Sequence, residues 1–224
     1  MDAINEFEIG ILEWIADNMH CGFLDAVLST VTHLGDAGIF WIILSIVLLF
    51  PKKTRRVGIT MGISLIMGLL ICNLAIKPLV ARIRPYDLLG TTPYIISAES
   101  DYSFPSGHAT ACFECATAIF IYSKKWGAAA YVLAAVVGFS RLYLFVHYPS
   151  DVICGAILGI IDGILAALIL KFIYKKLGER KKRRSCRRYD GKGYKIGAPF
   201  LAARLFVGVG GGRAAQHGLR RLLG

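Results

Sequence analysis

The sequence predicts an all-α protein: a polytopic membrane helix bundle of about five spans with an amphipathic surface helix at its N-terminus. Hydrophobic residues make up 55% of the 224 residues, and the mean hydropathy of +0.56 exceeds that of an ordinary soluble domain. Several apolar runs approach the ~20 residues that a helix needs to cross a bilayer. Because no alternating strand pattern is present, helices are the only spanning form expected.

The N-terminal segment, Asp2 to His20, is expected to form an amphipathic helix. Apolar residues such as Ile4, Phe7 and Ile11 recur at three- and four-residue spacing, while acidic residues fill the other side. This pattern is typical of a helix that lies at a membrane surface. The segment has no basic n-region and does not resemble a cleaved signal. A second helix at about residues 23–33 is too short and too polar to span alone.

Five candidate spans follow the second helix. Several are shorter than the usual ~20 residues, which favours a compact bundle with polar ends. The spans are expected at residues 37–50, 57–77, 107–122, 127–146 and 152–174.

Clusters of basic residues predict the orientation of these spans. The clusters lie at residues 52–56, 124–125 and 171–188, and all fall on one side if the spans alternate in direction. The positive-inside rule makes that side cytoplasmic. The formal net charge of +11 is therefore interpreted as a topology signal, and no nucleic-acid partner is expected. The loops 78–106 and 147–151 then share the outer face.

The chain is divided into three parts. Residues 1–20 are the surface helix, residues 21–176 the membrane-embedded domain, and residues 177–224 a basic, Gly/Arg-rich tail that is expected to be disordered. Most of the six cysteines lie in apolar stretches, and Cys112 and Cys115 form a C-x-x-C inside an apparent span without a second pair. They are interpreted as small apolar side chains of the bundle, not as a disulfide framework or a zinc site.

Charged and polar residues gather where the predicted spans meet the outer face. Charges that border a membrane region are costly, so they indicate a site unless they are trivially partnered. Lys77, Arg84 and Arg141 supply three positive charges with many donors, which suits a phosphate group. Ser106 and Gly107 precede a helix, and its exposed N–H groups favour an anion at that end.

Two histidines and an aspartate accompany the cations. His108 and His147 can serve as proton donor and nucleophile, and Asp151 can accept a hydrogen bond from His147 and so orient its ring. Taken singly, each cation could be an interfacial residue, and Ser106 or Asp151 could be a helix cap. The joint pattern favours a phosphate site over these separate interpretations.

Three sequence blocks carry these residues in order. They are K-x6-R-P from Lys77 to Arg84-Pro85, P-S-G-H from Pro105 to His108, and S-R-x5-H-x3-D from Ser140 to Asp151. A lone P-S-G-H would be a weak signal, but three ordered blocks at helix boundaries are specific. In this pattern, which covers residues 20–175, the chain resembles the type-2 phosphatidic acid phosphatase superfamily.

The resemblance implies a role for each residue. His147 would attack phosphorus and form a phosphohistidine with Asp151 as its partner, and His108 would protonate the leaving oxygen and then help to activate water. The residues that would hold the phosphate and stabilise its transition state are Lys77, Arg84, Ser106, Gly107 and Arg141. The resemblance also implies that no metal or other cofactor is needed, which suits a pocket whose three cations would repel a divalent ion. A metal site built from His108, His147 and Asp151 is the alternative.

The resemblance implies an integral-membrane lipid phosphate or diphosphate phosphatase of the cell membrane, whose partners are its lipid substrate and the bilayer. The active site is expected to face the extracytoplasmic side, with the C-terminus in the cytoplasm. This orientation favours undecaprenyl diphosphate as substrate, with phosphatidic acid and phosphatidylglycerol phosphate as alternatives. Vanadate-dependent haloperoxidases have a similar pocket but are soluble. A non-enzymatic membrane protein that retains the fold is the remaining alternative, although its motifs would be expected to be degenerate.

Two acidic residues lie inside the predicted spans. Glu114 is six residues after His108, and Asp162 is midway through the last span. Because charges in a membrane region face a cavity or a neighbouring helix, Glu114 is expected to point into the bundle interior below the pocket.

Overall fold

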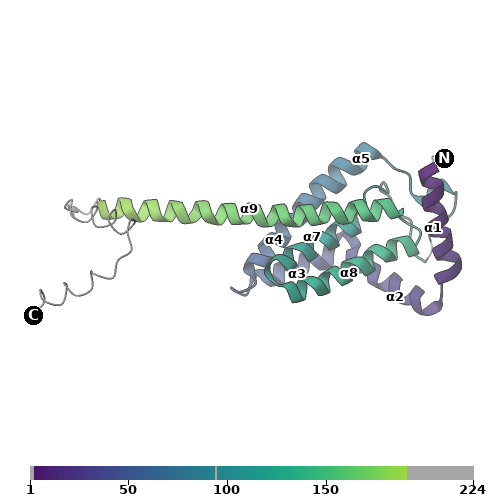
Figure 1. The fold of residues 1–224 in the computed structure, drawn as a ribbon, viewed down its shortest axis with the longest axis horizontal. Helices are drawn as coiled ribbons and strands as arrows, with labels where there is room; N and C mark the ends of the chain where they lie inside the picture. The colour runs from purple at the N-terminus through teal and green to yellow at the C-terminus, as the bar shows by residue number, and fades with distance from the viewer. Residues whose placement is uncertain (1–2, 94, 191–224) are drawn as a thin grey trace, which may run out of the picture. The chain divides into compact units, whose positions relative to one another are not determined.

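The computed structural model describes residues 3–93 and 95–190, and these form helices and loops without a strand. The expected all-α class is therefore confirmed. The helical segments in chain order are α1 (Ala3–Met19), α2 (Gly22–Thr32), the 3-10 helix η1 (His33–Gly38), α3 (Ile39–Leu49), α4 (Arg55–Gly68), the π-helix η2 (Leu69–Ile76), α5 (Lys77–Val80), α6 (Pro85–Leu88), α7 (Gly107–Tyr122), α8 (Lys124–Tyr143) and α9 (Pro149–Asp190) (Figure 1). The chain divides into two units, residues 1–174 and 175–224, and the first unit contains the candidate site.

Each of the five predicted spans coincides with helix in the structure. Within the described residues, three stretches are long and apolar enough to cross a membrane, namely Arg55–Leu88, Lys124–Tyr143 and Pro149–Arg180. A fourth is formed if Gly22–Asp36 and Ile39–Leu49, which meet at a bend of 58°, act as one broken span. The short second helix thus continues into the first predicted span. At 16 residues, α7 is shorter than the ~20 needed for a full crossing.

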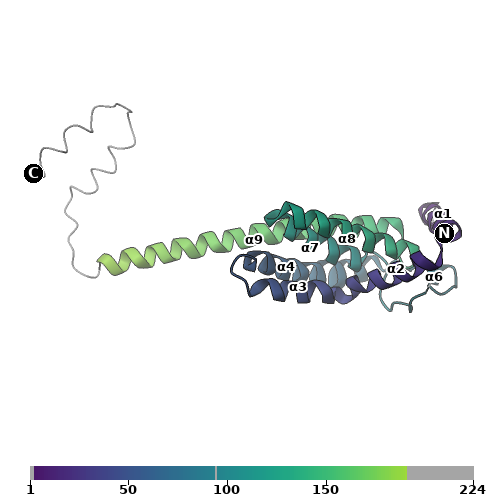
Figure 2. The same cartoon turned by 90° about the horizontal axis from the view of Figure 1, so that it is seen from below.

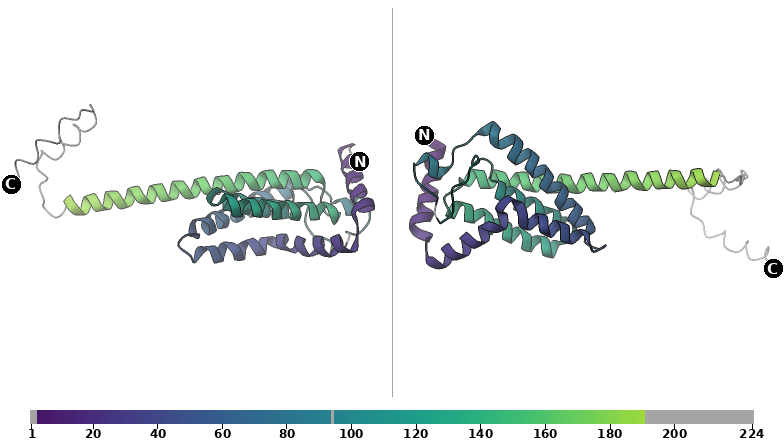
Figure 3. Two further views of the ribbon diagram at one scale, coloured as in Figure 1. Left: turned by 60° about the horizontal axis from the view of Figure 1, so that its bottom comes forward. Right: turned by 180° about the vertical axis from the view of Figure 1, so that it is seen from behind.

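The helix α1 lies across the end of the bundle where α8 ends and α9 begins (Figures 2 and 3). The apolar residues of α1 that pack against the bundle differ in part from the apolar stripe expected from the sequence. Ile9, Leu12 and Ile15 are buried, whereas Ile4 and Phe7 are 70% and 72% exposed. Apolar residues therefore occupy two neighbouring sides of α1, one packed on the protein and the other available to lipid.

The helix α7 is packed between α4, α8 and α9. Glycines on α9 permit the closest of these contacts. A Cβ on Gly159 would lie 2.5 Å from the carbonyl oxygen of Thr110, and one on Gly163 would lie 2.7 Å from that of Glu114. Since the obstructing atoms belong to the helix backbone, only glycine fits at these positions. The two helices that begin at the candidate site are thereby held in one relative position.

Buried polar side chains lie inside the bundle. The carboxyl group of Glu114 is 1% exposed and lines an internal cavity, which confirms its predicted inward direction. Gly68 of α4 makes room for it, because a Cβ there would lie 2.4 Å from Glu114 Oε2. Asp162 is equally buried. Cys112 and Cys115 are buried free thiols, as the apolar interpretation requires.

The last helix extends further than the sequence predicts. The disordered tail was expected from residue 177, but α9 continues through Asp190. The lysine- and arginine-rich residues in this part are good helix formers, which accounts for the extension. Residues 191–224, with the remainder of the predicted tail, lie outside the described residues.

Candidate active site

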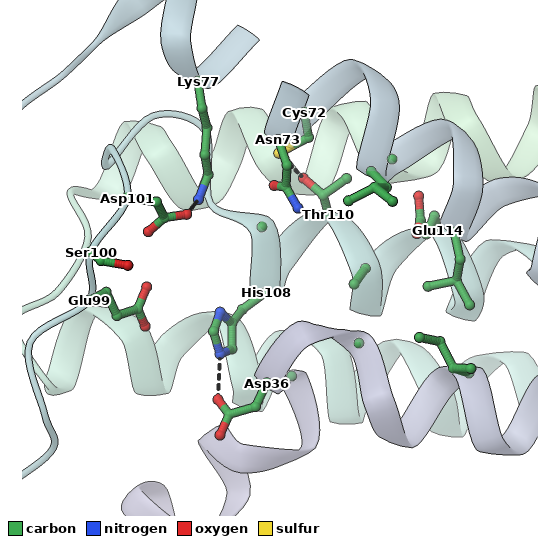
Figure 4. A pocket seen from close by; sticks show the side chains of 18 of the residues that line it. Asp36, Cys72, Asn73, Lys77, Glu99, Ser100, Asp101, His108, Thr110 and Glu114 are labelled. Carbon is green, nitrogen blue, oxygen red and sulfur yellow. Dashed lines mark hydrogen bonds and ion pairs between the residues drawn. The ribbon is translucent and has the colours of Figure 1, made fainter. Parts of the chain in front are cut away.

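The candidate site contains a cavity of about 550 Å³ at the end of the bundle where α7 begins (Figure 4). Its walls come from η1, α3, α4, η2, α5, α7 and the loop between α6 and α7 (residues 89–106), called the α6–α7 loop below. Of the predicted site residues, Lys77, Gly107 and His108 line this cavity. Arg84, Arg141, His147 and Asp151 are buried beside it.

The three predicted phosphate-binding cations converge on two carboxylates of the α6–α7 loop. Arg84 Nη2 lies 2.7 Å from Glu99 and 2.5 Å from Asp101. Lys77 forms an ion pair with Asp101, and Arg141 forms one with Glu99. Lys77 and Arg84 belong to one sequence block and Arg141 to another far along the chain, so folding creates one positively charged locus. Carboxylate oxygens already occupy it, which shows that the locus accommodates anions.

Hydrogen bonds to neighbouring groups hold the two arginines in place. Arg84 Nη1 donates to the carbonyl oxygen of Val146 at 2.9 Å, and its Nε donates to that of Asp101 at 2.9 Å. Arg141 Nη1 donates to Thr32 Oγ1 at 2.6 Å. Both guanidinium groups are almost completely buried. They are therefore fixed before any phosphate is bound.

The two loop carboxylates remain ionised because of these cations. Burial alone would raise the pKa of Glu99, but the charges of Arg141 and Arg84 outweigh burial and lower it. For Asp101, burial is likewise outweighed by its hydrogen bond to Lys77 and by the charges of Lys77 and Arg84, so its pKa is also lowered. At neutral pH the locus therefore holds three cations and two anions.

His147 lies next to the cation locus and is completely buried. Its Nε2 is 3.4 Å from Arg84 Nη1, and its Nδ1 is 3.4 Å from Ser103 Oγ. A guanidinium group can only donate, so these partners favour the tautomer with the proton on Nδ1 and a lone pair on Nε2. Burial, followed by the charges of Arg84 and Arg141, holds the pKa of His147 well below its ordinary value. The ring is consequently neutral and presents a nucleophilic nitrogen to the cation locus.

Asp151 lies behind His147 on the first turn of α9. The expected hydrogen bond between them is a contact of 3.5 Å from Nδ1 to Oδ2, longer than a typical hydrogen bond. Oδ2 instead accepts closer hydrogen bonds from Ser103 Oγ at 2.5 Å and from the Tyr148 N–H at 3.0 Å. The carboxylate is thus in place to orient the Nδ1 side of the ring, although it does not bind it tightly here.

His108 lines the cavity and has a carboxylate partner of its own. Its Nε2 is 2.9 Å from Asp36 Oδ1, and Figure 4 shows the ring between Asp36 and the group formed by Glu99, Asp101 and Lys77. Because the Asp36 carboxylate can only accept, Nε2 donates the hydrogen bond, and Nδ1 is the nitrogen available for proton transfer. This arrangement suits a general acid.

Ser106 and Gly107 form the start of α7. The buried hydroxyl of Ser106 caps the helix, accepting a hydrogen bond of 3.4 Å from the Ala109 N–H. A Cβ at Gly107 would lie 3.2 Å from Asn73 Oδ1 and 3.8 Å from Lys77 Nζ. Glycine therefore permits the close approach of Asn73 to the N-terminus of α7, whereas Lys77 Nζ would remain at ordinary van der Waals distance from a Cβ there.

The structure adds residues that the sequence did not single out for a role in the site. Asp36 lies in a Gly-Asp-Ala-Gly turn, and Arg82 lies two residues before Arg84 within the first motif block. Both positions offered a weak signal. Ser103 and the two loop carboxylates lie in a segment without periodicity, and Glu8 is one of several acids on α1. The added residues are Glu8, Asp36, Arg82 and Ser103, while Glu99 and Asp101 belong to the loop that the sequence places at the outer face.

The described residues do not assemble a set of ligands for the alternative, a metal site. Across residues 3–93 and 95–190, no group of three or more His, Cys, Asp or Glu side chains is placed to hold a metal ion. His108 and His147 contact different carboxylates, Asp36 and Asp151. Metal independence of the reaction stays a prediction.

A family model described as the PAP2 superfamily matches residues 57–176, more than half of the chain. The chain belongs to the PAP2 superfamily. This confirms the resemblance drawn from the three motif blocks. The match covers the cation locus, His108, His147 and Asp151, but it begins after α1 and η1.

Relatives of known name lie in the same superfamily. The chain is 32% identical over 176 residues to phosphatidylglycerophosphatase B of Bacillus subtilis, covering 72% of this chain and 78% of that protein. It is 37% identical over 120 residues to an undecaprenyl-diphosphatase of Sulfolobus acidocaldarius, covering 53% of this chain and 58% of the relative. The chain thus spans little more than half the length of the archaeal relative.

A solved structure shares the fold. It is the transmembrane PAP2-type phosphatidylglycerolphosphate phosphatase of Bacillus subtilis, which aligns with a TM-score of 0.60 and 26% identity over 79% of this chain and 88% of that one. Together with the apolar helices, this likeness identifies the PAP2 protein as a multi-pass membrane protein.

Proposed function

We propose that this PAP2 protein hydrolyses phosphate or diphosphate groups of membrane lipids through a phosphohistidine intermediate on His147. The observation that carries the proposal is the convergence of Lys77, Arg84 and Arg141 beside two differently partnered histidines. Three fixed cations stabilise the charge that develops on a transferring phosphoryl group. One histidine is held neutral for attack, and the other is paired with a carboxylate for proton donation.

The reaction begins when the substrate phosphate replaces Glu99 and Asp101 on the three cations. His147 Nε2 then attacks phosphorus, so that a nitrogen–phosphorus bond forms as the bond to the lipid oxygen breaks. His108 Nδ1 supplies a proton to that oxygen, and the lipid product leaves. Asp151 stabilises the Nδ1 proton of His147 as positive charge develops on the ring.

The second half of the reaction regenerates the enzyme. Neutral His108 accepts a proton from water, and the resulting hydroxide attacks phosphorus and breaks the nitrogen–phosphorus bond. Inorganic phosphate forms, and His147 returns to its neutral state. Each histidine thus ends the cycle in the protonation state in which it began.

Undecaprenyl diphosphate is the substrate we favour. A relative at 37% identity is named as an undecaprenyl-diphosphatase, and the cation locus holds two carboxylates, which suits a ligand with two anionic groups. A relative at 32% identity is named for phosphatidylglycerophosphate instead, so that lipid is the second candidate, followed by phosphatidic acid. In the orientation we propose, the site faces the extracytoplasmic side and the C-terminus is cytoplasmic, as the basic clusters favour.

Phosphate release by the purified protein tests the proposal. Undecaprenyl diphosphate, phosphatidylglycerol phosphate and phosphatidic acid are assayed in parallel with EDTA present, and His147→Ala is the control. Release that persists in EDTA and is lost in the variant is expected. A folded protein that releases no phosphate from any of the three lipids would favour the non-enzymatic alternative.

The intermediate can be examined directly. Brief reaction with substrate carrying radioactive phosphorus should label the wild-type protein and leave His147→Ala unlabelled. A phosphohistidine is a phosphoramidate, so the label should be lost in acid and retained in base. A label that is stable in acid would contradict the proposed nucleophile.

A further inference from the structure

The helix α1 contributes a buried carboxylate to the region behind the site. Glu8 is 5% exposed, although α1 is otherwise rich in exposed acids. Its Oε2 accepts a hydrogen bond of 2.6 Å from Arg82 Nη2, and its Oε1 accepts one of 2.7 Å from the N–H of Ser150. A carboxylate buried at this cost is expected to have a specific partner, and here the partner is Arg82.

Arg82 joins Glu8 to the aspartate behind the nucleophile. Its Nη1 donates to Asp151 Oδ1 at 2.6 Å and to Ser150 Oγ at 2.7 Å. Its Cζ lies 3.8 Å above the ring centre of Tyr148. Arg82 is thus held by ion pairs at both ends of its guanidinium group and by an aromatic face, a geometry that allows little movement.

Asp151 is shared between this arginine and the nucleophile. Its Oδ1 is bound by Arg82, while its Oδ2 accepts from Ser103 and lies 3.5 Å from His147 Nδ1. The negative charge of Asp151 can therefore stabilise the His147 ring only to the extent that the positive charge of Arg82 does not neutralise it. Glu8 counters the charge of Arg82, so that the group of Glu8, Arg82 and Asp151 carries one net negative charge.

From this geometry we infer that Glu8 is a positioning residue for catalysis, which acts through Arg82 on Asp151 and so on His147. The inference rests on the proposed function, because it assigns His147 as the nucleophile. Glu8 fixes the first turn of α9 through Ser150 and preserves the negative charge of Asp151 that stabilises the His147 ring during attack. It does not touch the cation locus, so substrate binding does not depend on it.

Kinetics of lipid phosphate hydrolysis test the inference with Glu8→Gln, which keeps the shape of the side chain and removes its charge. We expect kcat to fall by at least about tenfold, while KM stays within about twofold of the wild-type value. Glu13→Gln is the matched control, because Glu13 is an exposed acid on the same helix. It should leave both constants unchanged.

A double-mutant cycle separates action through Arg82 from simple tethering of α1. If Glu8 works through Arg82, Glu8→Gln should cause little further loss in an Arg82→Gln background. An equal loss in both backgrounds would show that Glu8 only anchors α1, and the inference would be wrong. The inference would also be wrong if folded Glu8→Gln had the kcat of the wild type, or if kcat fell as much in Glu13→Gln as in Glu8→Gln.

Thermal unfolding in detergent establishes that each variant is folded before the kinetics are compared. Should Glu8→Gln not fold, Glu8→Asp keeps the charge and shortens the side chain by one methylene. A fall in kcat without a change in KM is then expected, and an unchanged kcat would overturn the inference. Wild-type protein that releases no phosphate overturns the proposed function together with this inference, whereas active wild-type protein with unaffected Glu8 variants overturns the inference alone.

Discussion

The carboxylate of Asp101 occupies the position that the substrate phosphate takes in the proposed reaction. It forms ion pairs with Lys77 and Arg84, two of the three cations proposed to bind phosphate. An intramolecular anion at this position competes with any external anion for the same donors. Replacing Asp101 by Asn removes its charge with almost no change in shape, so the competition should weaken and anions should bind more tightly.

The structure gives the size of this effect. The side chain of Asp101 is 50% exposed, so solvent screens both ion pairs, although the cations themselves are buried. Exposed ion pairs contribute about 0.2–1 kcal/mol each, and two such pairs contribute about 1 kcal/mol together. That free energy corresponds to about a fivefold change in a dissociation constant. The difference should shrink at high ionic strength.

Inhibition of lipid phosphate hydrolysis by inorganic phosphate and by orthovanadate measures the change. The inhibition constants for Asp101→Asn are expected to be about fivefold lower than those of the wild type. Asp87→Asn is the control, because Asp87 is an exposed acid on α6, and its substitution changes the net charge of the protein equally. The control should leave the constants unchanged.

Two results would refute the reasoning. Unchanged inhibition constants in Asp101→Asn would mean that the carboxylate does not compete for the anion locus in solution. Raised constants would mean that Asp101 holds Lys77 and Arg84 in their binding positions, which is the opposite role.

Three further predictions concern the proposed general acid, the packing of α9 on α7, and the buried histidine proposed as nucleophile. Asp36→Asn should lower kcat on lipid phosphates by about 10²-fold. The fall in kcat should be much smaller on an aryl phosphate, because its leaving group needs little protonation. An equal fall in kcat on both substrates would exclude His108 as the acid. Gly159→Ala should lower the free energy of unfolding in detergent by about 1–3 kcal/mol, whereas Gly10→Ala, with no atom within 4 Å of the new Cβ, should not. The pKa of His147 is depressed, so below pH ~6.5 the unfolded chain binds a proton that the folded chain does not, and stability should fall as the pH is lowered from 7 to 5. His147→Gln should flatten that decline in unfolding midpoints, and an unaltered slope would show that the ring is not held neutral.

The sequence predicted the motif residues of the site because their types and spacing are tied to helix ends. Lys77, His108 and Asp151 each lie within the first turns of a helix or at its boundary, and hydropathy locates those boundaries well. The same pattern predicted the all-α class, the direction of Glu114 and the limits of α7. Local pattern was sufficient in these cases because helix formation and burial depend on neighbouring residues.

Partners that are distant in sequence were not predictable from pattern. Asp36 meets His108 across 72 residues, and Glu8 meets Arg82 across 74 residues. Such pairs depend on how helices pack, and neither periodicity nor composition encodes that. The side of α1 that packs on the bundle was not predicted for the same reason, since two adjacent sides of this helix are apolar and only packing distinguishes them.

The limits of the family match have a practical consequence for how this protein is divided. The matched residues begin at Val57, yet Glu8, Thr32 and Asp36 contact Arg82, Arg141 and His108 from earlier in the chain. An excised domain limited to residues 57–176 would retain every motif residue and lose these three contacts. The proposed catalytic unit is therefore larger than the segment that the family model matches, and shortening or rigidly fusing the N-terminal end should alter the candidate active site from outside its motifs.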